Sequence, residues 1–142
     1  MIVIDANLLL YAYVVDSKSH EDARRWLESA FSGDTPVLIP WHSIAAFIRI
    51  GTNPRLPGRP MPLATAVSIV DLWLAHPNVR VIGPGMDYWR HLRSMLLDGQ
   101  AFGPLATDAE LAALTIGVGG ILHSTDRDFA RFPGLRWKNP LV

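Results

Sequence analysis

The stretch Met1-Ile2-Val3-Ile4-Asp5-Ala6-Asn7 predicts the first strand of the fold and the turn that ends it. Ile2–Ile4 is short, apolar and β-branched, which is typical of a strand buried on both faces. Asp5 and Asn7 then favour the start of a helix. The rest of the chain repeats this succession of a short apolar run and a helical pattern. Such alternation predicts an α/β fold with a mostly parallel sheet of four or five strands, and residues 1–142 are expected to form one domain.

The expected elements follow one another along the whole chain. Four strands and a last edge strand are expected at Ile2–Ile4, Pro36–Ile39, Val79–Ile82, Ile121–Ser124 and around Arg136-Trp137. Helices are expected at Leu8–Val14, Glu21–Phe31, Trp41–Gly51, Leu63–Ala75, Met86–Leu97 and from about Thr107, with a short helical turn at Asp126–Arg131. Thr107 is expected to cap its helix, because its hydroxyl precedes Asp108 and Glu110 in a pattern close to a capping box. Thr52–Pro62 contains four prolines and a glycine, so an irregular loop is expected there.

Composition limits the class of protein. About half of the residues are apolar and only 18% are charged, which is typical of a globular chain. Lys plus Arg equals Asp plus Glu, so any electrostatic attraction to nucleic acid must be local. The chain has no cysteine, which leaves oxygen and imidazole as the possible metal ligands. Met1–Val15 lacks the basic start of a signal peptide and no apolar stretch has membrane-spanning length, so we expect a cytoplasmic protein with no membrane partner.

Three acidic residues lie at expected junctions between a strand and a helix. They are Asp5, Asp108 and Asp126. In an open parallel sheet such positions lie at one edge, outside the carboxyl ends of the strands, so the three carboxylates are expected to converge. Converging carboxylates repel one another unless a cation neutralises them, and Mg²⁺ or Mn²⁺ prefers such hard oxygen ligands. The pattern therefore predicts a metal-dependent enzyme.

Two polar neighbours are candidates for supporting this site. Asn7 could orient a ligand or a water, and Thr125 could hold a neighbouring carboxylate through its hydroxyl. Glu110 is expected to point away from Asp108, toward the surface or a partner. For each acid taken alone, helix capping is the commoner explanation. Their convergence at one expected sheet edge is what favours the functional interpretation.

Several sequence segments together resemble a known family. They occur in order at Ile4–Asn7, Phe47–Arg55, Thr107–Leu114, Ser124–Phe129 and Phe132–Leu141. In these segments the chain resembles the PIN-domain ribonucleases, in particular the VapC-type toxins of bacterial toxin–antitoxin pairs. The resemblance implies a three-layer α/β/α fold and an Mg²⁺- or Mn²⁺-dependent endoribonuclease that hydrolyses RNA phosphodiester bonds. It also implies a homodimer that a small VapB-type antitoxin neutralises in a toxin–antitoxin hetero-oligomer.

The same resemblance assigns roles to individual residues. Asp5, Asp108 and Asp126 fall on the family's catalytic and metal-binding acids, and Asp128 is an accessory acid in the same segment as Asp126. Two arginines are candidates for contact with RNA phosphate or an antitoxin carboxylate, namely Arg49 and Arg127. Arg49 could alternatively form a structural salt bridge. Arg127 would contribute to a local basic rim together with Arg131, Arg136 and Lys138.

One position departs from the family pattern. The family usually carries a Glu immediately before the Phe of this helix, whereas here Ala46 precedes Phe47, which removes one acid from the expected four. We hypothesise that water fills the gap, or else His42, which shares the helix face of position 46. An alternative is a degenerate domain that binds RNA or antitoxin without cleaving. A phospho-acceptor receiver domain is disfavoured, because His123-Ser124-Thr125-Asp126 stands where such a domain needs a lysine.

A second functional surface is suggested by the first two helices. The segment Leu8–Val15 is rich in Leu, Tyr and Val and contains more apolar residues than the core of one chain needs. Together with Ala23–Phe31 it could form an apolar groove for a partner helix. Ordinary burial is the alternative explanation.

Overall fold

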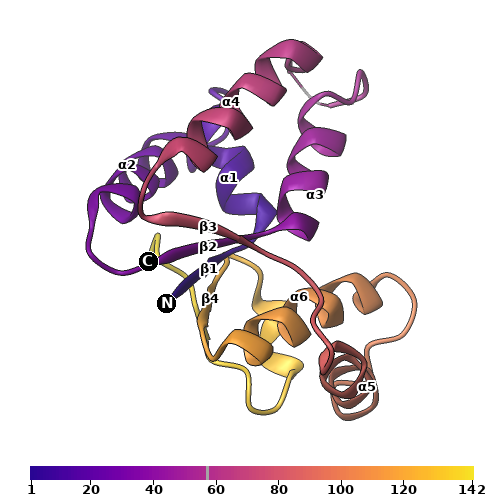
Figure 1. Ribbon diagram of the computed structural model, residues 1–142. Coiled ribbons are helices and arrows are strands. Elements are labelled where there is room, and N and C mark those ends of the chain that lie inside the picture. Colours follow the sequence, from indigo (N-terminus) through magenta and orange to yellow (C-terminus); the bar gives the residue numbers. More distant parts are fainter. Residues whose placement is uncertain (57) are drawn as a thin grey trace.

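The computed structural model describes residues 1–56 and 58–142, so position 57 of the expected loop lies outside the described residues. Its strands are β1 (Ile2–Ile4), β2 (Val37–Pro40), β3 (Val79–Ile82), β4 (Ile121–His123) and β5 (Trp137–Lys138). Its helices are α1 (Ala6–Tyr13), α2 (His20–Ser32), α3 (Trp41–Gly51), α4 (Leu63–Ala75), α5 (Tyr88–Asp98) and α6 (Leu105–Val118), with the 3₁₀ turn η1 (Arg127–Arg131) (Figure 1). Within the described residues, none of these helices combines the length and apolar character needed to cross a bilayer.

The strands form one parallel sheet in the order β3-β2-β1-β4-β5. The first strand is central: Ile2 is in register with Val37 of β2 on one side and with Ile121 of β4 on the other. The pairs β2–β3 and β4–β5 are parallel as well. The expected parallel sheet is therefore confirmed, and the short edge strand near the end of the chain is part of it.

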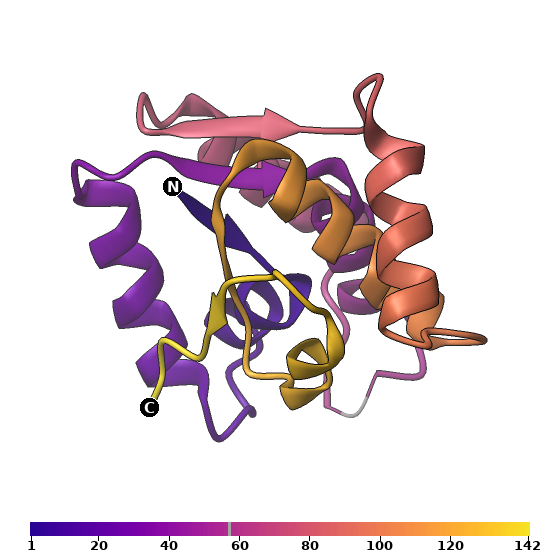
Figure 2. The same ribbon diagram turned by 90° about the horizontal axis from the view of Figure 1, so that it is seen from below.

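Helices cover both faces of this sheet (Figures 1 and 2). Successive residues of a strand point to opposite faces, so Ile4 packs with α1, α2, α3 and α4, whereas Val3 packs with α5, α6 and η1. Leu38 of β2 likewise faces the second core while its neighbours Val37 and Ile39 face the first. Two apolar cores separated by a sheet confirm the three-layer α/β/α architecture. They also explain why the strands are apolar throughout instead of alternating.

The carboxyl ends of the parallel strands all lie at one edge of the sheet. Asp5 follows β1, Trp41 follows β2, and Ser124 follows β4. Ser43 fastens this edge, because its buried hydroxyl donates a hydrogen bond of 2.7 Å to the carbonyl of Ile4. The start of α3 is thereby tied to the end of the central strand, and the edge has a fixed geometry on which a site can be built.

The start of α6 differs from the sequence-based expectation. The helix begins at Leu105, and Pro104 is its N-cap, with φ of −60° and ψ of −25°. Because the backbone of Pro104 is already near-helical, the chain turns into the helix earlier than Thr107. The predicted cap at Thr107 is therefore wrong, and α6 has no side-chain capping bond. Asp108 consequently lies inside the first turn, where the helix dipole favours a negative charge.

Candidate metal centre

Three carboxylates from two elements meet at the sheet edge. They belong to Asp108 in the first turn of α6, Asp126 just before η1, and Asp128 within η1. One oxygen from each lies within 4.8 Å of the others, which is a spacing that a single cation can bridge. Asp108 and Asp126 are half-buried and Asp128 is exposed, so the group opens to solvent on one side. The structure thus brings together two of the three predicted acids and the accessory acid.

The third predicted acid, Asp5, stands beside this group and is connected to it. Its Oδ2 accepts a hydrogen bond of 2.7 Å from the buried hydroxyl of Ser124. The same hydroxyl oxygen accepts a bond of 3.0 Å from the backbone N–H of Asp126. One serine therefore fixes Asp5 and Asp126 relative to each other. Asp5 is outside the 4.8 Å group, but its negative charge acts on Asp108.

The pKa of Asp108 reflects its burial and the negative charges around it. Burial is the largest cause that raises its pKa, and the negative charges of Asp126, Asp5 and Asp128 raise it further. The guanidinium of Arg131 opposes this, and the net pKa is about 6 against an ordinary 3.8. A set of oxygen donors that repel one another is what a hard divalent cation stabilises. The donor set therefore fits Mg²⁺ or Mn²⁺.

The pKa of Asp5 is also raised, mainly because the carboxylate is buried. The hydrogen bond from Ser124 lowers it, the charge of Asp126 raises it, and the charge of His42 lowers it. Asp5 stands at the N-cap position of α1 without a side-chain capping bond, although the backbone N–H of Ala6 at the start of that helix also lowers its pKa. Asp126 caps η1 by accepting a hydrogen bond of 2.8 Å from the N–H of Asp128.

The two predicted supporting residues are close to the acids. Asn7 is half-buried in the first turn of α1, two residues after Asp5. Thr125 is half-buried between Ser124 and Asp126. The hydrogen bond to a neighbouring carboxylate that was expected from Thr125 is made by Ser124 instead. Supporting roles for Asn7 and Thr125 stay predictions.

The predicted arginines are placed differently from one another. Arg127 begins η1, is exposed, and stands between Asp126 and Asp128 in the chain. Arg49 is exposed in the last turn of α3, about 12 Å along the helix axis from its start. In the described part of the chain it also forms no ion pair. Arg136 bonds the carbonyl of Gly119 at 2.7 Å and is thereby drawn away from a basic rim.

A charged contact lies one helical turn before position 46. His42, one turn before Ala46 on α3, lies with its Nε2 3.4 Å from a carboxylate oxygen of Glu110 on α6. Glu110 keeps 45% of its side chain exposed, in line with the expected surface position, and it also contacts His42 of α3. The Nδ1 atom of His42 is buried without a hydrogen-bond partner in the described structure. An acid from α6 thus reaches the helix face where the family's acid is missing.

Sequence reasoning missed three residues that shape the site. Ser124 and Ser43 are buried hydroxyls that fix the ends of β4 and β1. Arg131 donates bonds of 3.2 Å to the carbonyls of Gly99 and Gln100, which ties η1 to the loop before α6. The position of Ser124, between the end of a strand and Asp126, could have predicted its role in holding the acids. No local pattern marks Ser43 or Arg131, since their partners are distant in the sequence.

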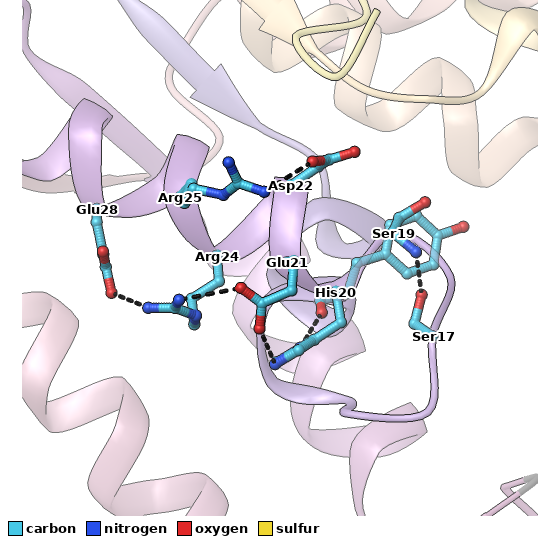
Figure 3. Close-up of polar contacts among 9 residues, drawn as sticks. Ser17, Ser19, His20, Glu21, Asp22, Arg24, Arg25 and Glu28 are labelled. Atoms are coloured by element: carbon cyan, nitrogen blue, oxygen red, sulfur yellow. Dashed lines mark hydrogen bonds and ion pairs between the residues drawn. The ribbon is translucent and has the colours of Figure 1, made fainter.

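An apolar groove is present beside α1 and α2, with α4 as its other wall, while Leu27, Phe31 and Trp73 of its lining are buried in the core, as the alternative of ordinary burial expects. Its volume is about 540 Å³, and its apolar lining includes Tyr13, Val15, Leu27, Phe31, Leu72 and Trp73. Polar contacts run along the adjoining face of α2 (Figure 3). There Arg24 bridges Glu28 at 2.8 Å and Glu21 at 3.1 Å, while His20 contacts the carbonyl of Tyr11 at 2.9 Å. The groove is therefore apolar inside and charged at its rim.

Comparison with known proteins agrees with the fold. A family model described as PIN domain matches residues 2–135. Ribonuclease VapC33 of Mycobacterium tuberculosis is 39% identical over 145 aligned residues, which cover 99% of both chains. Ribonuclease VapC37 of the same species is 38% identical over 140 residues, covering 99% of this chain and 97% of that protein. VapBC2 from Rickettsia felis, solved bound to a DNA fragment from their promoter, has a TM-score of 0.69 at 16% identity and covers 98% of each chain. The chain therefore belongs to the PIN-domain family, alongside the VapC ribonucleases.

Proposed function

We propose that this protein is a metal-dependent endoribonuclease toxin that hydrolyses RNA phosphodiester bonds. The observation that carries the proposal is the group formed by Asp108, Asp126 and Asp128, with Asp5 fixed beside it through Ser124. Full-length similarity to proteins named ribonucleases supports RNA as the substrate. A site that opens to solvent on one side suits a long polymeric substrate.

In this proposal Asp108, Asp126 and Asp128 hold Mg²⁺ or Mn²⁺, and Asp5 contributes from the end of β1. The bound ion would polarise a phosphoryl oxygen and lower the pKa of a water molecule. Ser124 keeps Asp5 oriented by donating to its carboxylate, which also favours the ionised form that metal binding needs. Asn7 and Thr125 complete the surroundings of the acids, and Arg127 attracts phosphate to the rim.

A second candidate function follows from Ala46. With one family acid missing, the domain could bind RNA or a partner protein without cleaving it. The contact between His42 and Glu110 argues against this alternative, because it brings an acid from α6 to His42, which shares a face of α3 with Ala46. Its imidazole also lies close enough to lower the pKa of Asp5. We therefore propose that this pair, with water, takes the place of the missing glutamate.

We further propose that a VapB-type antitoxin neutralises the protein and that the toxin itself forms a homodimer. The similarity to a VapBC complex supports the first partner. The groove lined by Tyr13, Leu27 and Trp73 suits the apolar face of a helix, and the charges of Arg24 and Glu28 at its rim can select the partner's polar residues. Burial of the groove by an antitoxin would also cover its exposed apolar residues, such as Val15 and Leu72.

The test is cleavage of a mixture of structured RNAs by the purified protein, with Mn²⁺ or with EDTA. Products that vanish in EDTA support the nuclease, whereas RNA binding without products supports the degenerate domain. We expect Asp5→Asn, Asp108→Asn and Asp126→Asn each to remain folded and to lose nearly all activity, because an under-liganded site binds metal weakly. Metal-dependent cleavage retained in all three variants would contradict the proposed site.

A further inference from the structure

Trp41 is an exposed aromatic residue at the same sheet edge as the acids. It is the first residue of α3 and directly follows Pro40, the last residue of β2. Its exposed fraction is 56%, although an indole ring is among the most favourable groups to bury. Single exposed apolar residues are common, so exposure alone implies nothing. The surroundings of this ring distinguish it.

The indole is held in place by the end of the neighbouring strand. Gly83 follows β3, and a Cβ atom at Gly83 would come within 3.1 Å of Cδ1 of Trp41. The ring therefore rests against backbone at a position where a side chain would crowd it. An aromatic ring supported on one side and open on the other loses little conformational freedom when a second flat group covers it. The arrangement is a preformed stacking surface.

The two residues that follow Trp41 in α3 connect this surface to the acids. The next residue, His42, influences the pKa of Asp5 through its charge and contacts Glu110 on α6. The residue after that, Ser43, is bonded to the carbonyl of Ile4, directly before Asp5. Trp41 thus belongs to the helical turn that is anchored beside the central acid. The ring lies toward β3, whereas the acids lie at the ends of β1 and β4, so an RNA strand that runs along this edge of the sheet from the acids toward β3 reaches it.

We propose that Trp41 stacks on an unpaired nucleobase of the RNA that occupies the acidic site. The inference rests on the proposed function, since it takes RNA as the substrate. Proteins recognise single-stranded RNA mainly by stacking splayed bases on aromatic rings. The chain's net charge is zero, so attraction between the whole molecule and RNA phosphates adds little to the binding affinity. A contact that does not depend on charge, such as base stacking, is then more important. Every base has a face that can stack on an indole ring, so Trp41 raises the affinity for unpaired RNA of any sequence. Paired bases are not free to stack on it, so the affinity for duplex RNA is not raised.

The experiment measures binding of a fluorescently labelled single-stranded oligoribonucleotide by anisotropy in EDTA, where no cleavage is needed. Removing one stacked base contact by alanine typically weakens binding by ~1–3 kcal/mol, so Trp41→Ala should raise the Kd by about 5- to 150-fold. Trp41→Phe retains a ring and should retain most of the affinity. Trp89→Ala is the matched control, because Trp89 is 63% exposed on α5. The same oligonucleotide annealed to its complement should bind all these variants alike.

An unchanged Kd for Trp41→Ala, or an equal loss for Trp89→Ala, would overturn the inference. So would a loss of self-association in Trp41→Ala, measured by sedimentation, with RNA binding intact, because Trp41 would then be a subunit contact. The two proposals can fail separately. A wild-type protein that binds RNA through Trp41 but never cleaves it overturns the nuclease and leaves the stacking role standing.

Discussion

Asp108 determines how the stability of the metal-free protein depends on pH. Its native pKa of about 6 lies above its ordinary 3.8, mainly because it is buried and secondly because Asp126 and Asp5 repel it. A carboxyl group with a raised native pKa binds its proton more tightly in the folded than in the unfolded state. Its stabilising effect is therefore fully present below pH 3.8 and is lost as the pH rises through about 6.

We therefore expect Asp108→Asn to unfold at higher denaturant concentration than the wild type at neutral pH in EDTA. The advantage should shrink as the pH falls below about 6 and disappear near 3.8. Urea unfolding of both proteins across this range measures the difference. A variant that is equally less stable at every pH would show that Asp108 is structural and not under repulsion.

Ser124 provides a prediction that separates it from its neighbour Thr125. Ser124→Ala removes the donor to Asp5 and the acceptor for the N–H of Asp126, both in a fully buried place. Loss of such a buried bond typically costs about 1–3 kcal/mol. We expect that loss in the free energy of unfolding and a lower cleavage rate. Thr125→Ala is the matched control, and an equal effect there would contradict the assigned role of Ser124.

The predictability of the site follows from where its residues stand in the chain. Asp5 and Asp126 could be predicted because each follows a strand, and parallel strands end at one edge. The contact of Glu110 with His42 could not be predicted, because the two residues are far apart in the sequence and meet only through the tertiary structure. A pattern thus predicts which acids converge, whereas the bonds that orient them come from tertiary structure.

At the scale of elements, the β1–β4 pairing depends on a close approach at Gly120. A Cβ there would lie 2.9 Å from Cγ2 of the buried Val3 and 3.3 Å from the carbonyl of Met1. The pairing sets the register that brings Asp5 to the acids. The strands and helices were predicted to within a few residues. The N-cap of α6 was predicted wrongly, because the chain turns at Gly103–Pro104, before the expected cap at Thr107.

We expect Gly120→Ala to lower the free energy of unfolding by about 1–3 kcal/mol, since Val3 has no room to move. Gly117→Ala is the contrasting variant. Gly117 is in α6, and the nearest atom to its added Cβ is 3.7 Å away on His91, an ordinary contact. Alanine should stabilise the helix there by up to about 1 kcal/mol. Chemical denaturation of both variants checks the opposite signs.

At the scale of the whole molecule, the proposed metal site joins the layers of the fold. Asp5 extends from the central strand, while Asp108 and Asp126 come from the segments that cover the second face. Alternation of strands and helices predicted these layers. The strand order β3-β2-β1-β4-β5 requires knowledge of which strands pair, and no residue pattern in the chain encodes it. A ligand bound at this edge of the sheet contacts several elements at once, so it binds only when all of them are folded.

Binding of Mn²⁺ should therefore stabilise the entire protein against heat. A ligand that binds only the folded state at a hundred times its Kd adds about 2.7 kcal/mol, which corresponds to a rise of several degrees in Tm. Scanning calorimetry with increasing Mn²⁺ measures this rise. Asp108→Asn should respond weakly, and an equal rise in that variant would place the ion elsewhere.

The central position of β1 has a consequence for synthesis on the ribosome. Asp5 emerges first, but its partners Asp108 and Asp126 belong to segments made more than a hundred residues later. At ordinary elongation rates of roughly 5–20 residues per second, that interval is on the order of ten seconds. A nascent chain that stops before Asp108 lacks Asp108 and Asp126, two of the acids that the proposed metal site needs. Under the proposed function, the ribosome that makes this toxin is spared its activity until translation is nearly complete.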